Sequence, residues 1–157
     1  MIAVSACLFG INCKYTGNNN ENDIVIKYLK GKQYILICPE QLGGLSTPRN
    51  PAEIINGNGY NVLNDESKIL DNKGIDVTYK FINGANESLK ILNMYGCKKA
   101  ILKEGSPSCG SNFIYDGSFL GKKIDGLGTT TALFRNNKIE VISEFDLFKN
   151  IHSKSSK

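Results

Sequence analysis

The sequence predicts a single α/β domain: a Rossmann-like, open and mostly parallel sheet flanked by helices, with a small β-hairpin insertion. Short apolar runs that suit buried strands alternate with stretches of helical periodicity, an order typical of βαβ units. Glycine, proline and asparagine clusters separate these segments. A length of 157 residues suits one domain. We expect residues 1–148 to form the domain and residues 149–157 to form a flexible, basic tail.

The first half of the chain contains two apolar runs, residues 2–6 and 34–38, that are short enough for buried strands. Between them, apolar residues recur with helical spacing over residues 22–30, and Gly31 ends that helix. Beyond the second run, closely spaced glycines and prolines predict a loop over residues 41–50.

The second half begins with a glycine- and asparagine-rich turn over residues 56–60, expected to lie between short strands that include residues 60–63. Helical spacing of apolar residues is clearest over residues 77–95. A third buried strand is expected at residues 99–103 and a last strand at 139–142. Residues 114–120 surround an Asp-Gly pair, which predicts a hairpin.

Composition is that of an ordinary globular protein, with 41% apolar and 22% charged residues. The net charge of +4 is mild and the lysines form no stripe, so no nucleic-acid partner is expected. No apolar segment approaches the ~20 residues of a membrane helix, and the first residues lack a basic secretory signal. Five cysteines favour a reducing compartment. We therefore expect a cytoplasmic monomer or homodimer without a membrane partner.

Three cysteines directly follow predicted strands, among glycines, prolines and serines: Cys7, Cys38 and Cys109. Ligands of open α/β sheets bind outside the carboxyl ends of the strands. We therefore expect these thiols to converge on a metal or cluster site. Cys97 is expected to be a small buried apolar side chain. Cys13 is left open between a fourth ligand, a redox partner of Cys7 and simple packing.

The cysteine spacing favours an iron–sulfur cluster over zinc. Structural zinc sites use four ligands, often in Cys-x-x-Cys pairs, and no such pair occurs here. The one histidine, His152, lies in the expected tail. Zinc is therefore less favoured, unless Cys13 completes the set. Iron–sulfur clusters normally take four thiolates, so three would leave one iron open to a substrate.

Polar residues accompany the cysteines in each motif. Glu40 follows Cys38 by two residues and is a candidate general acid or base, or else a cap for the loop. Ser106 and Ser108 either contact a ligand or stabilise their turn. Arg49 lies in a glycine-containing loop beside the expected site.

A pair of glycines, Gly126 and Gly128, leads into a predicted helix that begins with three threonines. The free main-chain N–H groups at such a start bind anions in some proteins. The alternative is a helix capped by Thr129 or Thr130, with the glycines allowing close packing. Neither a P-loop nor a complete Gly-x-Gly-x-x-Gly motif is present.

Taken together, the motifs make the sequence similar to a family first defined as domain of unknown function 523, which includes bacterial thiouracil desulfidases. The resemblance extends from residue 1 to about residue 145. Its motifs are Ser5-Ala-Cys-Leu-x-Gly-x-x-Cys-x-Tyr-x-Gly17, Cys38-Pro-Glu-x-x-Gly-Gly-Leu-x-x-Pro-Arg49, Lys103-x-x-Ser-Pro-Ser-Cys-Gly110 and Gly126-x-Gly128.

The resemblance implies an oxygen-sensitive 4Fe–4S cluster and a thiolated pyrimidine or similar sulfur compound as substrate. Hydrolysis would replace C=S by C=O and release sulfide, without net redox change. The open iron would bind the sulfur of the substrate. The expected metal ligands are Cys7, Cys38 and Cys109, the expected catalytic residues Glu40 and Ser106, and the expected substrate-binding residues Ser108, Arg49, Lys103 and Tyr15.

The chain departs from the family pattern at Thr16, where aspartate is common. This change bears on specificity if that acid contacts the substrate. Two alternatives to the desulfidase remain open: another cluster-dependent protein of sulfur metabolism, and a cysteine-based metal or redox sensor that uses a Cys7–Cys13 disulfide.

Overall fold

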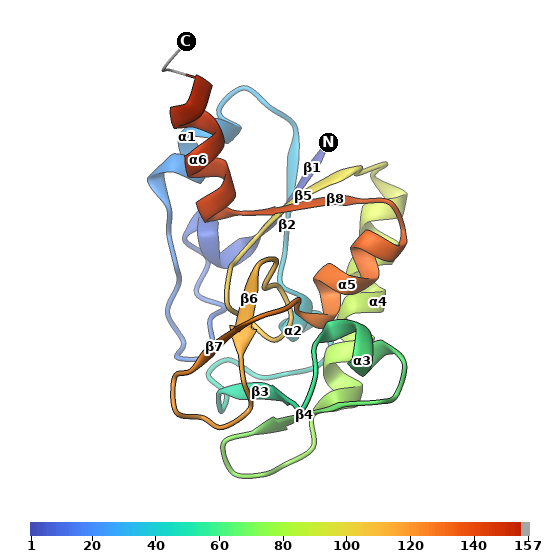
Figure 1. Ribbon diagram of the computed structural model, residues 1–157. Helices are drawn as coiled ribbons and strands as arrows, with labels where there is room; N and C mark the ends of the chain where they lie inside the picture. Colours follow the sequence, from blue (N-terminus) through green and yellow to red (C-terminus); the bar gives the residue numbers. More distant parts are fainter. Residues whose placement is uncertain (155–157) are drawn as a thin grey trace.

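Four parallel strands form the central sheet of residues 1–154, the part of the chain that this computed structural model describes (Figure 1). The strand order is β2-β1-β5-β8. In register, Ile2 lies opposite Tyr34 on one side and Lys99 on the other, so three strands begin and end together. The predicted open, parallel sheet is confirmed. Its strands are β1 (Ile2–Ser5), β2 (Tyr34–Ile37), β5 (Lys99–Leu102) and β8 (Glu140–Ser143).

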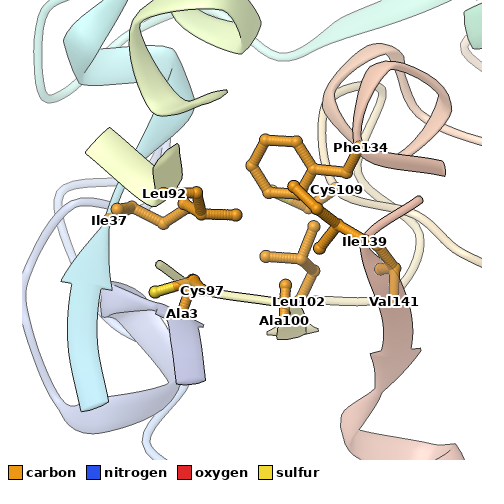
Figure 2. Packing of buried hydrophobic residues seen from close by; sticks show 10 residues of the cluster. All are labelled: Ala3, Ile37, Leu92, Cys97, Ala100, Leu102, Cys109, Phe134, Ile139 and Val141. Atoms are coloured by element: carbon orange, nitrogen blue, oxygen red, sulfur yellow. The ribbon is translucent and has the colours of Figure 1, made fainter. Parts of the chain in front are cut away.

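Helices cover both faces of the sheet (Figure 1). Successive residues of a strand point to opposite faces, and accordingly Ala3 and Val4 belong to different core clusters. Figure 2 shows the cluster beneath α4 and α5, where Leu92 and Phe134 pack with Ala100. The other cluster lies beneath α1 and α6. The helices are α1 (Asp23–Leu29), α4 (Thr78–Met94), α5 (Thr129–Asn136) and α6 (Glu144–Lys154).

Two antiparallel hairpins lie beyond the sheet in the described part of the chain. A hairpin is present as expected and pairs β6 (Phe113–Tyr115) with β7 (Lys123–Asp125), so its second strand begins three residues beyond the predicted range of 114–120. A second hairpin pairs β3 (Ala52–Ile55) with β4 (Lys68–Asp71); β3 lies where a short strand was expected before the glycine- and asparagine-rich turn, whereas β4 was not predicted. A small apolar cluster that includes Phe81 of α4 joins both hairpins. The insertion is therefore packed against the domain.

The predicted strand at residues 60–63 is wrong, because these residues form the helix α3 (Gly59–Leu63). The Asn58 side chain accepts the Tyr60 N–H at 2.9 Å, and Asn61 Oδ1 accepts the Asn58 N–H at 3.0 Å. This reciprocal arrangement is a capping box, which starts a helix. The cap therefore overrides the β preference of the short apolar run.

The predicted loop at residues 41–50 is wrong at its first two residues, which belong to a short helix, α2 (Pro39–Leu42), with proline in its first turn. Two glycines bring α2 against α4. A Cβ atom at Gly43 would collide with the Lys80 carbonyl, and one at Gly84 with the Pro39 carbonyl. This close packing fixes the start of α2, where Cys38 is the N-cap residue.

The C-terminal helix α6 extends through residue 154, and so includes six residues of the segment that we expected to be a flexible tail. Residues 155–157 lie outside the described part of the chain. Within that part, none of the helices combines the length and the apolar character needed to cross a membrane.

Candidate functional site

The cysteines predicted to form a site lie at the carboxyl ends of three neighbouring strands. Cys7 lies in the 3-10 helix η1 (Ala6–Phe9) directly after β1, and Cys38 caps α2 after β2. Cys109 belongs to the cysteine loop, residues 103–112, between β5 and β6. With Cys13, they line one cavity of about 270 Å³, close to the lower size limit of small-molecule sites, about 300 Å³. The fold thus brings the predicted thiols together.

Cys13 contacts two of the expected ligands. Hydrogen bonding with the Cys13 thiol lowers the pKa of Cys7 and Cys38, the latter to about 7, and raises the pKa of Cys13 itself. Burial raises the pKa of the Cys109 thiol. The thiolate is the form that binds metal. Cys7 and Cys38 are therefore the thiols of this set that deprotonate most readily.

Glu40 lies on the cavity wall within a hydrogen-bond network. Its Oε2 accepts from Arg49 Nε at 2.7 Å, and its Oε1 accepts from Ser106 Oγ at 3.1 Å. The guanidinium of Arg49 also donates to the Cys13 carbonyl at 2.9 Å. Ser106 Oγ accepts from the Cys109 N–H at 3.2 Å. The carboxylate is thereby held between the segments that carry Cys13 and Cys109.

The other predicted substrate contacts divide into two groups. Tyr15 and Lys103 line the cavity, and Lys103 Nζ also pairs with Glu144 Oε1 at 2.8 Å. Ser108 does not line it. This serine is 1% exposed, and its hydroxyl bonds to Thr130 Oγ1 at 2.8 Å. The structure therefore places Ser108 outside the cavity, where its hydroxyl joins the cysteine loop to α5.

The cysteine loop packs against the glycine-led start of α5. Main-chain N–H groups of residues 128–130 donate to carbonyls of this loop, so they are not free to bind an anion. Of the alternative reading, the side-chain cap from Thr129 or Thr130 is wrong, because Gly128 is the N-cap residue and no side chain caps this helix. A Cβ atom at Gly128 would collide with the Ser108 main chain. Close packing is therefore what this glycine provides.

Glu104, which the sequence-based prediction missed, folds the cysteine loop around its carboxylate. The residue is 4% exposed. Burial by itself would raise its pKa, but hydrogen bonds hold the pKa below its usual value. An acidic residue before a glycine is too common a signal to predict such a role. The donors are the main-chain N–H groups of Gly105, Ser111, Asn112 and Phe113 and the side chains of Ser111 and Asn112.

Replacing this carboxylate is expected to destabilise the fold. Each buried donor left without an acceptor costs about 1–3 kcal/mol, so Glu104→Ala should lower the free energy of unfolding by roughly 3 kcal/mol or more. Urea denaturation of the cluster-free protein measures the change. Glu53→Ala is the matched control, because Glu53 accepts only two main-chain N–H bonds among the described contacts. Equal losses in the two variants would contradict the prediction.

The stabilisation that the Glu104 carboxylate provides depends on pH. The pKa of Glu104 is lowered in the folded state, so its stabilisation is fully present above the unfolded pKa of about 4.3. It is lost as the pH falls through the folded pKa. The difference in unfolding free energy between wild type and Glu104→Ala should therefore narrow in acid.

The chemistry of the donor set fits an iron–sulfur cluster. Four thiols line the cavity, three of them the predicted ligands from separate strand ends, and no imidazole from the described residues does so. In that part of the chain, no three or more histidine, cysteine, aspartate or glutamate side chains are arranged around a single metal ion. The thiolates of a cluster bind different irons and so stand further apart than the ligands of one ion. Thiolates are the ligands that such clusters take.

These features define the class: an α/β protein with a thiol-lined site at the carboxyl edge of a parallel sheet, beside a fixed carboxylate. The chain belongs to the 2-thiouracil desulfurase family, whose pattern it matches over residues 2–146. It is 48% identical over 147 residues to the uncharacterised protein YbbK of Bacillus subtilis (strain 168), covering 94% of this chain and 97% of YbbK.

A solved structure extends the comparison to three dimensions. The fold is similar to that of the 4Fe-4S-dependent thiouracil desulfidase TudS, with a TM-score of 0.81 and 38% sequence identity. The match covers 99% of this chain and 98% of TudS. The resemblance inferred from the motifs is confirmed.

Proposed function

We propose that the protein is an iron–sulfur-cluster-dependent desulfidase that replaces C=S by C=O in a thiolated pyrimidine such as 2-thiouracil. Family membership and the full-length similarity to a thiouracil desulfidase support the proposal. The observation that carries it is the convergence of Cys7, Cys38 and Cys109 on a cavity whose wall also holds Glu40. The net reaction consumes one water and releases one hydrogen sulfide, with no electrons transferred.

The thiols are suited to the cofactor that this chemistry needs. We propose Cys7, Cys38 and Cys109 as the ligands of a 4Fe–4S cluster. Such a cluster, held by three thiolates, supplies an iron without a protein ligand, a soft Lewis acid for a thiocarbonyl sulfur. The pKa of Cys38, lowered to about 7 by hydrogen bonding with Cys13, favours the thiolate near neutral pH.

Glu40 is the proposed general acid and base. Each carboxylate oxygen can accept more than one hydrogen bond, so the contacts to Arg49 and Ser106 leave Glu40 able to accept a proton from water. Arg49 was expected to bind substrate, but its guanidinium donates to Glu40 and to main-chain and side-chain oxygens of the protein. We assign Arg49 as the positioning residue for Glu40.

Tyr15 and Lys103 are the proposed substrate contacts, beside Ser106, the second proposed catalytic residue. All three line the same cavity as the cysteines. Tyr15 is 43% exposed, so its ring stands at the opening of the cavity. The ammonium of Lys103 provides hydrogen-bond donors on the wall, whereas the single hydroxyl proton of Ser106 is donated to Glu40. A planar heterocycle with carbonyl groups matches this combination of an aromatic ring and donors.

An anaerobic experiment tests the proposal. The protein is reconstituted with iron and sulfide, both are quantified per chain, and 2-thiouracil is added while uracil and sulfide are measured. Four irons per chain and equal yields of uracil and sulfide are expected, with no turnover by the cluster-free protein. A cluster without turnover would redirect the assignment to another sulfur substrate. Failure to bind a cluster under anaerobic conditions would overturn it.

A further inference from the structure

Ser5 lies between the two chain segments that carry Cys7 and Cys109. It is the last residue of β1 and precedes η1, which carries Cys7. On the neighbouring strand, β5 leads into the cysteine loop, which carries Cys109. The Ser5 side chain is buried, with 3% of the residue exposed, so it has little access to water.

The hydrogen bonds of Ser5 fix where its single hydroxyl proton points. Ser5 Oγ accepts the main-chain N–H of Lys103 at 3.0 Å, just beyond the end of β5. A serine hydroxyl has one proton to donate. The oxygen donates it to Cys109 Sγ at 3.8 Å. Cys109 is 6% exposed, so Ser5 is the polar partner that the fold supplies to this sulfur.

Resting on the cluster assignment made above, we propose that Ser5 is a positioning residue for the cluster, donating a hydrogen bond to the Cys109 thiolate. Groups that bond to a metal ligand orient it and tune the metal. Here the bond holds the Cys109 sulfur toward β1. The Ser5 side chain thereby fixes the position of the Cys109 sulfur relative to the segment that carries Cys7.

The hydrogen bond has an electronic consequence as well as a geometric one. Reduction potentials of iron–sulfur clusters depend on hydrogen bonds to the sulfurs. A donor to a thiolate ligand stabilises the more negative, reduced cluster and so raises the potential. Loss of the bond should therefore lower the potential and weaken cluster binding. Both effects are measurable without turnover.

The test compares the reconstituted wild type with Ser5→Ala. Loss of a group that bonds to a metal ligand commonly costs about 10–100-fold in affinity, so iron transfer to a chelator should accelerate to that extent. A redox titration followed by electron paramagnetic resonance should give a more negative potential. Ser88→Ala is the matched control, because Ser88 is fully buried in α4 and its hydroxyl bonds to the Gly84 carbonyl.

Ser5→Thr keeps the hydroxyl and should restore both readouts toward wild type, which separates the hydrogen bond from a general loss of packing. A potential and a chelation rate unchanged in Ser5→Ala would overturn the inference while the cluster assignment stands. Equal shifts of both readouts in Ser88→Ala would overturn it in the same way. A wild-type protein that binds no cluster would instead overturn the proposed function, and this inference with it.

Discussion

Glu40→Gln is expected to reduce the rate of thiouracil desulfuration by about 10²–10⁴-fold, the usual contribution of general acid–base catalysis. The substitution keeps the shape of the side chain. The amide oxygen of glutamine can still accept from Arg49, whereas the Ser106 hydroxyl, which already accepts the main-chain N–H groups of Ser108 and Cys109, loses its acceptor on residue 40. The contact to Arg49 therefore survives, while the group that takes a proton from water is lost.

Iron content separates this effect from damage to the site. Because Glu40 is not a proposed ligand, the variant should bind as much iron and sulfide as the wild type and show the same visible spectrum. Glu87→Gln serves as the control, since Glu87 lies on the exposed side of α4 and pairs only with Lys90 among the described ion pairs. Wild-type turnover by a fully loaded Glu40→Gln protein would show that another group moves the proton.

The sheet could be predicted from the sequence because its strands are short apolar runs with clear boundaries. The long helix was equally clear, and the structure places α4 (Thr78–Met94) within the predicted residues 77–95. The prediction failed at α3, where the capping box of Asn58 and Asn61 decides the conformation. It missed β4 and its pairing with β3, because such strands gain stability from pairing with each other and from packing, neither of which is local.

The cysteine site could be predicted for a different reason. Parallel strands place their carboxyl ends together, so residues that follow β1, β2 and β5 must meet once the sheet is assumed. The partner of each polar side chain could not be predicted in this way. Arg49 lies nine residues from Glu40, and Ser106 lies 66 residues away. Glu104 and Ser5 were missed because their contacts exist only in the folded loop.

Cys109→Ser is expected to abolish cluster binding, with iron and sulfide falling to background after anaerobic reconstitution. A serine hydroxyl matches the size of the thiol but is a harder ligand and is not deprotonated near neutral pH, whereas iron–sulfur clusters require thiolates. Exchanging a buried thiol for a hydroxyl without a new partner also costs about 1–3 kcal/mol in folding. Loss of iron must therefore be separated from loss of stability.

Cys97→Ser makes that separation. Cys97 and Cys109 belong to the same core cluster (Figure 2), and both are buried. Cys97 does not line the cavity. The two variants should lose similar unfolding free energy, yet Cys97→Ser should retain its iron. Full iron in Cys109→Ser would contradict the proposed ligand set.

Cys13→Ser should keep the cluster, because Cys13 is not a proposed ligand and a serine hydroxyl preserves the size of the thiol and its hydrogen bonding to Cys7 and Cys38. Loss of iron in this variant would instead make Cys13 a ligand.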